Sequence, residues 1–337
     1  MTYHMHKFDP ARVDIPRTYG ALLVGGFVAA TFSGVVTVQA CAYSKLFPRD
    51  RLALKLLVLL VWVLDSCHTC FVISSLWDHF VTHFGDVRRI DYIPWSLALT
   101  VAFTAALTFV VHCFFVRRIH KLSVGNWLIT VPLTMLACAR LAFACLTTAK
   151  MITLRSMTLF VEKYTWSFTL GLSISSLLDI LITGFLCYLL LRSQKETSSL
   201  NHVLDKLLLY AFESGSLTTA AAVVSLACWI SMPTNLIFMA LHFVISKFYA
   251  NSLLATLNRR HSLRKAQCQS WSGMRSPGFP EGTWVPELHK YGPPPSPTFS
   301  LKSTRSKNVD KISVEVEQTQ TMLSPYEEPQ SPAPAYT

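Results

Sequence analysis

The sequence predicts an all-α membrane protein, a seven-transmembrane helix bundle followed by a disordered C-terminal tail. Of the 337 residues, 51% are hydrophobic and only 15% are charged, a composition that argues against a soluble globular domain. Seven apolar runs are each long enough to cross about 30 Å of hydrocarbon as an α-helix. After residue 257 the composition shifts to Pro, Ser, Gln and charged residues, which is typical of disorder.

The expected spans follow one another through short connections. They cover residues 19–44, 52–76, 95–116, 127–150, 166–191, 207–230 and 235–257. Aromatic residues such as Tyr19, Trp95 and Trp127 stand at their ends, as is typical of membrane interfaces. We expect residues 1–18 to be a short extracellular or lumenal N-terminus without a cleavable signal peptide, and residues 258–337 to be a disordered cytosolic tail.

Lysine and arginine predict the orientation. The loops that an outside N-terminus assigns to the cytosol carry more of these residues than the opposite loops, notably at Lys45–Arg51 and Arg117–Lys121, and cytosolic loops are the positive ones. The net charge of +11 lies in these loops and the tail. No basic face with interleaved aromatics predicts nucleic acid binding. We expect a multi-pass protein of the lipid bilayer, in the plasma membrane rather than an internal one.

The tail offers sites for contact and modification. Its first part carries Arg259, Arg260, Arg264 and Lys265 without an acid, which suits anionic lipids. Cys268 is a candidate for palmitoylation, although an unmodified thiol is the simpler interpretation. Four serines precede proline and are candidates for phosphorylation: Ser276, Ser296, Ser324 and Ser331. A cytosolic partner could bind this segment.

Ionisable residues inside the spans mark the candidate site. Asp65, Arg140 and Asp179 lie near the middle of the second, fourth and fifth spans, and Glu213 lies near the start of the sixth. A charge at a helix centre costs roughly 2.5–3.5 kcal/mol on insertion, so such residues face the bundle interior. We expect Asp65, Arg140 and Asp179 to share one polar site, with His68 one turn from Asp65.

This site has a functional and a structural interpretation. A pocket for a ligand or ion would make the protein receptor-like or sensory, or else a transporter or channel with these charges along its pathway. The same charges could instead form a network that only fixes the register of the helices. We find no convincing internal repeat and no matching pair of Pro-broken helices in the sequence, which disfavours carriers built from repeats.

Two other residue sets suggest metal chemistry. His79 and His83, beside Asp78 and Asp86, could ligate zinc in a membrane-embedded metal-dependent enzyme, but they lack a third placed ligand. Cys67-His-Thr-Cys70 lies within an apolar span without a second Cys or His pair, which favours buried thiols. We expect no catalytic residue, metal site or cofactor.

Lys247 invites comparison with a lysine that forms a retinal Schiff base. Phe243 stands one turn earlier, where a carboxylate counter-ion could sit. A lysine that is paired internally, or that extends toward the interface, is therefore the better interpretation.

Several segments together form a specific pattern. They are Trp62–His68, Phe115–Ile119, Asp205–Leu207, Ser214–Thr218 and Lys247–Asn258. In these segments the chain resembles a large set of seven-span membrane proteins of mushroom-forming fungi, whose C-terminal part is known only as a domain of unknown function. The resemblance is strongest over residues 178–260 and implies such a domain at about 172–260. It implies the seven-span plan, but no activity, ligand or cofactor.

Overall fold

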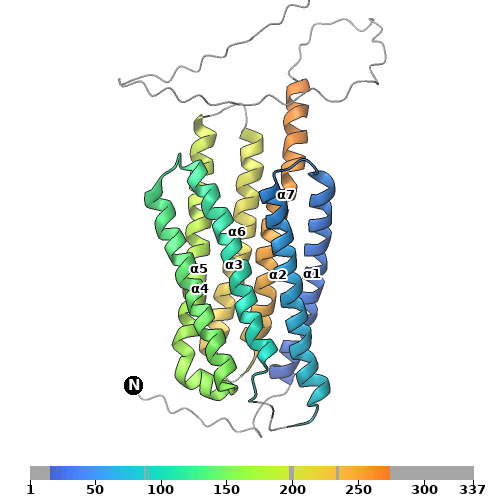
Figure 1. Cartoon of the computed structure of the whole chain (residues 1–337). Helices are drawn as coiled ribbons and strands as arrows, with labels where there is room; N and C mark the ends of the chain where they lie inside the picture. The colour runs from blue at the N-terminus through green and yellow to red at the C-terminus, as the bar shows by residue number, and fades with distance from the viewer. Residues whose placement is uncertain (1–15, 87–88, 90, 197–200, 233–234, 274–337) are drawn as a thin grey trace, which may run out of the picture. The chain divides into compact units, whose positions relative to one another are not determined.

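The structure is a computed structural model that describes residues 16–86, 89, 91–196, 201–232 and 235–273. Most of this part of the chain forms seven long α-helices in one bundle (Figure 1). They are α1 (Ala21–Leu46), α2 (Leu52–Trp77), α3 (Trp95–Leu122), α4 (Trp127–Leu154), α5 (Met157–Glu196), α6 (Asn201–Ser231) and α7 (Ile237–Gly273). Short π-helical segments, η2 (Pro16–Gly20) and η3 (Asp78–Thr82), precede α1 and follow α2.

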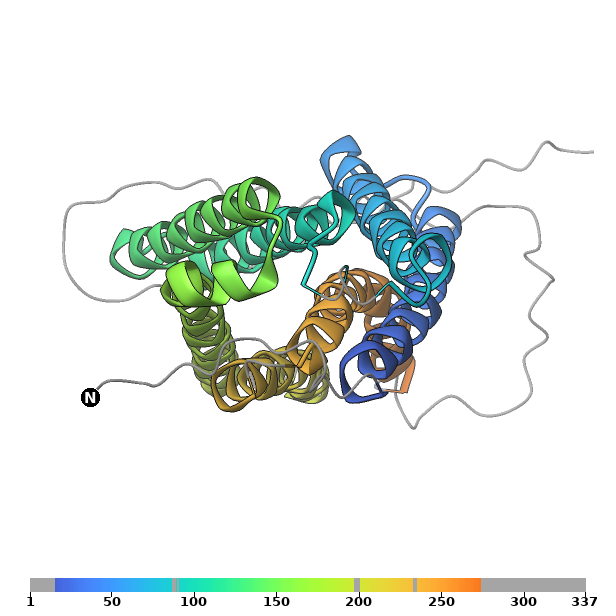
Figure 2. The same ribbon diagram turned by 90° about the horizontal axis from the view of Figure 1, so that it is seen from below.

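The helices form a ring in chain order, which α1 closes by packing on α7 (Figure 2). Helix α7 also contacts α2 and α3. In the most apolar window of α7, 67% of the residues are buried inside the protein, against 22% for α4. Helix α7 is therefore an inner helix, whereas α4 is largely peripheral. We call the end of the bundle where α1 begins the N-face, and the end where α7 finishes the C-face.

Within the described residues, six helices are long and apolar enough to cross a membrane, which supports a multi-pass integral membrane protein. In α6 (Asn201–Ser231) the continuously described apolar stretch is Gly215–Ser231, which is shorter than a span, so the seventh crossing stays a prediction. Large apolar side chains such as Phe27, Leu59 and Met135 are exposed on the outside of the bundle. In an integral membrane protein, these side chains contact lipid.

Two helices extend beyond the expected spans. Helix α5 begins at Met157 rather than 166, and a non-helical residue, Tyr164 (φ −127°, ψ 15°), marks a kink near its start. Helix α7 continues past residue 257 to Gly273, because residues 258–272 contain neither Pro nor Gly and many good helix formers. The expectation that disorder begins at residue 258 is therefore wrong for this extension. Residues 274–337 lie outside the described part.

At the N-face, the Asp91 carboxylate joins the loop between α2 and α3 to the start of α5. Asp91, between α2 and α3, accepts hydrogen bonds from the backbone N–H and hydroxyl of Thr158, both at 2.7 Å, and from the hydroxyl of Ser156. Tyr92 and Ser156 also form an isolated antiparallel β-bridge. These contacts fix the starts of α3 and α5 relative to each other, so the helices that carry the interior polar residues enter the bundle at defined positions.

Candidate functional site

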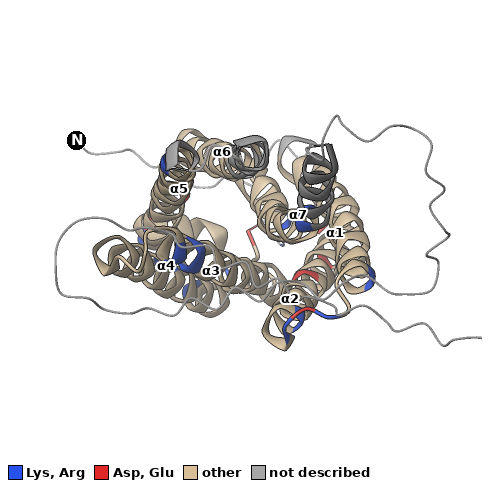
Figure 3. Ribbon diagram, turned by 90° about the horizontal axis from the view of Figure 1, so that it is seen from above, with Lys and Arg blue, Asp and Glu red and all other residues tan. Residues whose placement is uncertain are grey.

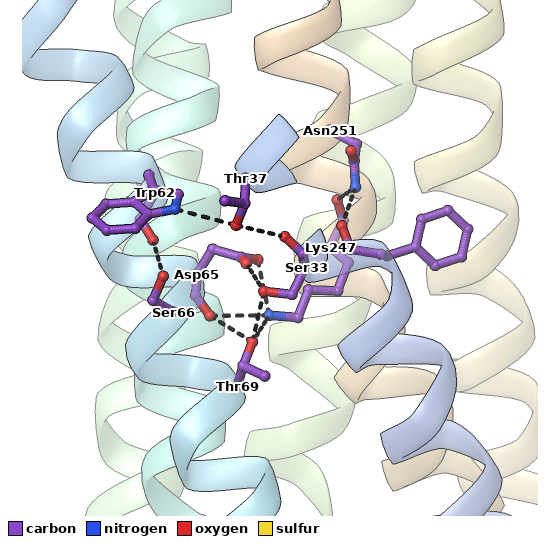
Figure 4. Close-up of polar contacts among 9 residues, drawn as sticks. Ser33, Thr37, Trp62, Asp65, Ser66, Thr69, Lys247 and Asn251 are labelled. Carbon is purple, nitrogen blue, oxygen red and sulfur yellow. Dashed lines mark hydrogen bonds and ion pairs between the residues drawn. The ribbon is translucent and has the colours of Figure 1, made fainter. Parts of the chain in front are cut away.

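Four residues of α1, α2 and α7 form what we call the lysine network: Ser33, Asp65, Thr69 and Lys247 (Figure 4). The Lys247 Nζ lies 2.9 Å from Asp65 Oδ1. It also donates to the main-chain oxygen of Asp65 at 3.0 Å and to the Thr69 hydroxyl at 2.6 Å. An ammonium has three N–H donors, so every donor of this lysine has an acceptor.

The Asp65 carboxylate is equally well paired. Its second oxygen accepts a hydrogen bond from the Ser33 hydroxyl at 2.5 Å. Lys247 is 0% exposed and Asp65 1%, so the pair is shielded from water and lipid. Seen from the C-face, acidic and basic ribbon segments lie together where α7 meets α1 and α2 (Figure 3). A buried charge is tolerated when it is paired and hydrogen-bonded, and both charges meet this condition.

Amide side chains continue the contact between α1 and α7 toward the C-face. Asn251, one turn after Lys247, donates to the main-chain oxygens of Lys247 at 2.9 Å and Phe32 at 3.4 Å, and accepts from the Gln39 amide at 3.2 Å. Asn258 donates to the main-chain oxygen of Gln39 at 2.9 Å. Amides at these positions therefore hold the two helices together over several turns.

A second cluster, the aspartate network, joins α3, α5 and α7 and consists of His112, Ser175, Asp179 and Tyr249. Asp179 Oδ1 lies 2.9 Å from His112 Nε2, and the Tyr249 hydroxyl donates to the other carboxylate oxygen. The Ser175 hydroxyl lies 3.2 Å from the Tyr249 hydroxyl. All four residues are buried. Tyr249 is two residues after Lys247, so roughly opposite faces of the same turn of α7 contact the two networks.

Arg140 of α4 is a buried cation without such pairing. It is 6% exposed, and its Nε and Nη1 atoms have no hydrogen-bond partner. Asp179 and Tyr249 are close enough to interact with it electrostatically. Within the part of the chain that the structure describes, however, neither Asp179 nor Asp65 forms an ion pair with it. His242 of α7, also in electrostatic range, is 4% exposed and has two unpaired ring nitrogens.

The predicted site residues thus fall into two groups rather than one. Asp65, Arg140 and Asp179 are all buried, but Asp65 pairs with Lys247, whereas Arg140 and Asp179 are neighbours on the other side of α7. The expected meeting of all three is wrong, because α7 lies between α2 and α5. His68 is fully buried with both ring nitrogens unpaired. The side chain of Glu213 lies outside the described part.

Two small cavities lie in the interior near Arg140 and Asp179. The N-face cavity has a volume of about 20 Å³ and is lined by Arg140, His242 and Thr147, among others. The C-face cavity, of the same volume, is lined by His112, Asp179 and other residues. About 10–15 Å³ is enough for one water molecule. Each cavity therefore admits a particle of that size, but no organic ligand.

A larger groove, which we call the α1–α2 groove, lies toward the C-face. Its volume is about 380 Å³, within the range of about 300–1,000 Å³ that small-molecule sites occupy. Most of its lining is apolar or aromatic: Thr37, Ala40, Cys41, Tyr43, Ser44, Phe47, Lys55, Val58, Leu59 and Trp62. The indole N–H of Trp62 donates to Thr37 at 3.2 Å, and Thr37 donates to the Ser33 main-chain oxygen at 3.0 Å. The groove is therefore connected to the lysine network.

A set of contacts at the C-face, the C-face clasp, consists of Tyr43, Phe47, Asp50 and Arg260. Arg260 Nη2 lies 2.6 Å from Asp50 Oδ2, which also accepts from the Tyr43 hydroxyl at 2.9 Å. The guanidinium lies 4.6 Å from the Phe47 ring centroid. Arg260, predicted to contact anionic lipid, is thus engaged by the loop between α1 and α2. The side chains of Arg264, Lys265 and Cys268, and Ser276, Ser296, Ser324 and Ser331, lie outside the described part.

The histidines after α2 make local contacts. His83 Nδ1 lies 3.3 Å from Asp78 Oδ1, and His79 packs edge-on against Tyr19. Among the described residues, no group of three or more His, Cys, Asp or Glu side chains is placed to hold a metal ion. Cys67 and Cys70 are free thiols.

The sequence did not place Lys247, His112 and Tyr249 in the candidate site, although each contacts one of its carboxylates. Lys247 carried a usable signal, because a lysine within an apolar span needs a carboxylate of similar depth, and Asp65 is one. His112 and Tyr249 gave no such signal, since neither must be charged and both residue types occur commonly in protein interiors.

Comparisons with known proteins identify a single domain. Residues 175–262 match a family of unknown function, DUF6534. The match covers the half of α5 that holds Asp179, then α6, and α7 through Ser262. No match was found among curated proteins or among solved structures. The matched region thus contains Lys247, Tyr249 and Asp179, whereas Asp65, His112 and Arg140 precede it.

Proposed function

We propose that the protein is a receptor-like membrane protein in which α7 moves relative to α1, α2 and α5 and carries this movement to the cytosolic side. One observation carries the proposal. Among the described helices, α7 is the only one that supplies a residue to the lysine network, the aspartate network and the C-face clasp: Lys247, Tyr249 and Arg260. A shift of α7 would therefore change all three together.

The chemistry of these contacts favours two discrete positions of α7 over a continuum. Separating Lys247 from Asp65 without new partners leaves two buried charges unpaired, which is strongly unfavourable. An intermediate position is therefore costly, and α7 would exchange between arrangements in which the charges are satisfied. Switching proteins use bistable packing of this kind. The helical extension to Gly273 would move with α7 and present the change to a cytosolic partner.

The α1–α2 groove favours an amphipathic, anionic lipid-like molecule as the ligand. Its walls are mostly apolar, and Lys55 lines it. Three more exposed cations lie at or near the adjoining loop: Lys45, Arg49 and Arg51. An acyl chain would contact the walls while a negatively charged headgroup interacts with the cations at the interface. The interior cavities, at about 20 Å³ each, are too small for such a molecule.

A ligand in this groove would contact residues of one α7 attachment and a residue bonded to a second. Tyr43 and Phe47 line the groove and belong to the C-face clasp. Trp62 and Thr37 also line it, and Thr37 is bonded to Ser33 of the lysine network. Ligand binding can shift an equilibrium only through different interactions with the two states, and these shared residues supply that difference.

The test uses the full chain in phosphatidylcholine nanodiscs, with oleoyl lysophosphatidic acid as the probe and monooleoylglycerol as its uncharged counterpart. Amide hydrogen exchange of residues 245–260 is measured with and without each lipid. We expect the anionic probe to change exchange in α7 saturably, and the neutral lipid to do so much less. The Lys55→Gln variant should lose the response. Lys121→Gln, which removes an exposed charge at the C-terminal end of α3, should keep it. Unchanged exchange in the wild type at saturating probe would overturn the proposal.

A transporter or channel is the second candidate, favoured by the positions of the two interior cavities. The cavity lined by Arg140 lies toward the N-face and the cavity lined by Asp179 lies toward the C-face, and residues of α3, α5 and α7 line both. Water-sized spaces beside ionisable groups are features of ion and proton pathways. Ion and proton flux into proteoliposomes, compared between the wild type and Asp179→Asn, tests this function. Flux equal to that of protein-free vesicles would remove it.

A further inference from the structure

We infer that the N-face cavity is a binding site for one small monovalent anion, chloride or an ion of similar size, held by Arg140 and His242. The inference rests on the groups that line the cavity and on its volume. It does not depend on movement of α7, so it stands or falls separately from the proposed function.

The first support is the unpaired guanidinium of Arg140. An arginine keeps its charge in proteins and has five N–H donors. Arg140 is only 6% exposed, and its N–H donors on Nε and Nη1 have no acceptor. A buried charge of this kind requires a counter-charge or strong hydrogen bonds, so the protein interior lacks an acceptor at this position.

Asp179 is the nearest candidate for that counter-charge, but its oxygens are already engaged. One is bonded to His112 and the other to Tyr249, and the carboxylate forms no ion pair with Arg140 within the described residues. The other buried carboxylate, Asp65, is paired with Lys247. The charges that the chain itself places in the interior therefore leave Arg140 without direct compensation.

The second support comes from the rest of the cavity wall. His242 lines it, is 4% exposed, and has no hydrogen-bond partner on either ring nitrogen. A neutral histidine has one N–H donor. Thr147 also lines the cavity, and its hydroxyl lies 2.9 Å from that of Ser167. Among the described residues no carboxylate lines this cavity, so its polar lining suits a negative occupant.

The cavity volume selects the class of anion. About 20 Å³ leaves room for one particle of roughly the size of water or a halide. Phosphate, sulfate or a carboxylate ligand would not fit without rearrangement of the helices. A bound water would satisfy hydrogen bonds but would supply no charge, which distinguishes the two occupants by experiment.

Chloride dependence of stability is the primary test. The full chain in nanodiscs is unfolded thermally in sodium chloride or sodium gluconate at constant ionic strength. A ligand that binds only the folded state stabilises it in proportion to the logarithm of its concentration above Kd. We expect chloride to raise Tm by about 2–5 °C for each tenfold increase in concentration. Retention of ³⁶Cl⁻ by the purified protein measures binding directly.

Three variants identify the site. Arg140→Met should abolish both the chloride dependence and ³⁶Cl⁻ retention. Ala144→Val adds volume at another lining residue and leaves the arginine in place. It should reduce ³⁶Cl⁻ retention at least several-fold. This variant replaces Arg140→Met as the test if Arg140→Met does not fold. Arg117→Gln removes an exposed arginine of α3 and should retain both properties.

Each result decides the inference. Loss of both properties in Arg140→Met, or loss of ³⁶Cl⁻ retention in a folded Ala144→Val, with both properties intact in Arg117→Gln, supports the site. A wild type that has the same Tm in chloride and gluconate and retains no ³⁶Cl⁻ overturns it and indicates a water-filled cavity. Full chloride dependence in Arg140→Met also overturns it, because the ion would then bind elsewhere.

Discussion

Lys247 and Arg140 are both buried cations in the interior of one helical bundle, but their surroundings are opposite. All three donors of Lys247 have acceptors, one of them a carboxylate 2.9 Å away. Arg140 has two nitrogens without any acceptor, beside a cavity of about 20 Å³. A fully paired buried charge holds two helices together, whereas an unpaired buried charge indicates that its counter-ion is missing. Substitutions at the two positions should therefore differ in sign as well as size.

The largest effect is expected where pairing is complete. Asp65→Leu would leave the ammonium of Lys247 buried and unpaired, and breaking a buried pair from one side costs about 3–5 kcal/mol. We expect little folded protein, measured as the monodisperse fraction in size-exclusion chromatography. The double variant Asp65→Leu/Lys247→Met removes both charges and should recover most of the folded yield. A double variant as poor as the single one would show that the charges themselves are required.

A smaller loss is expected in the aspartate network. Tyr249→Phe deletes one hydroxyl and leaves an Asp179 oxygen without its donor, at a cost of about 1–3 kcal/mol. Thermal unfolding monitored by tryptophan fluorescence measures this loss. Tyr188→Phe, which changes an exposed tyrosine of α5, is the matched control and should leave Tm unchanged. An equal Tm for wild type and Tyr249→Phe would mean that water replaces the hydroxyl.

The sequence predicts the depth of these residues better than their partners. The insertion cost of a charge indicates that Asp65, Arg140 and Asp179 face inward, and all three are buried. Which carboxylate meets which cation depends on the rotation of each helix and on the packing of α7 against α1, α2 and α3. Neither property follows from the pattern of one span. The apolar character of the spans is local information, whereas the Asp65 contact with Lys247 joins residues 182 positions apart.

The helical extension of α7 likewise depends on more than the composition of its own residues. Composition after residue 257 indicates disorder for the tail as a whole. Residues 258–272, however, continue a helix that is already nucleated, and extending a helix by one residue is far easier than starting one. Arg260, within this extension, then reaches Asp50 at 2.6 Å. The charge of Arg260 led to the prediction of a lipid contact, and the structure shows an ion pair with Asp50 in the loop between α1 and α2.

The C-face clasp should contribute less than either interior network. The side chains of Arg260 and Asp50 are 27% and 15% exposed, and ion pairs at exposed positions contribute only about 0.2–1 kcal/mol. Arg260→Gln should therefore change Tm by no more than about 4 °C. If α7 moves as proposed, the variant should accelerate amide exchange near residues 255–260 more than this stability change explains. Equal acceleration along the whole of α7 would indicate global destabilisation instead.

The smallest effect, and the one with opposite sign, is expected at Arg140. In gluconate its cavity holds no counter-ion, so Arg140→Met removes an unpaired buried charge and should leave Tm unchanged or slightly raised. In chloride the wild type gains the binding free energy of the ion, whereas the variant does not. The wild type should therefore be the more stable protein at high chloride, and the two Tm curves should converge or cross as chloride falls. A variant less stable than the wild type by the same margin in both salts would place Arg140 in the same class as Lys247, a cation whose partners belong to the chain itself.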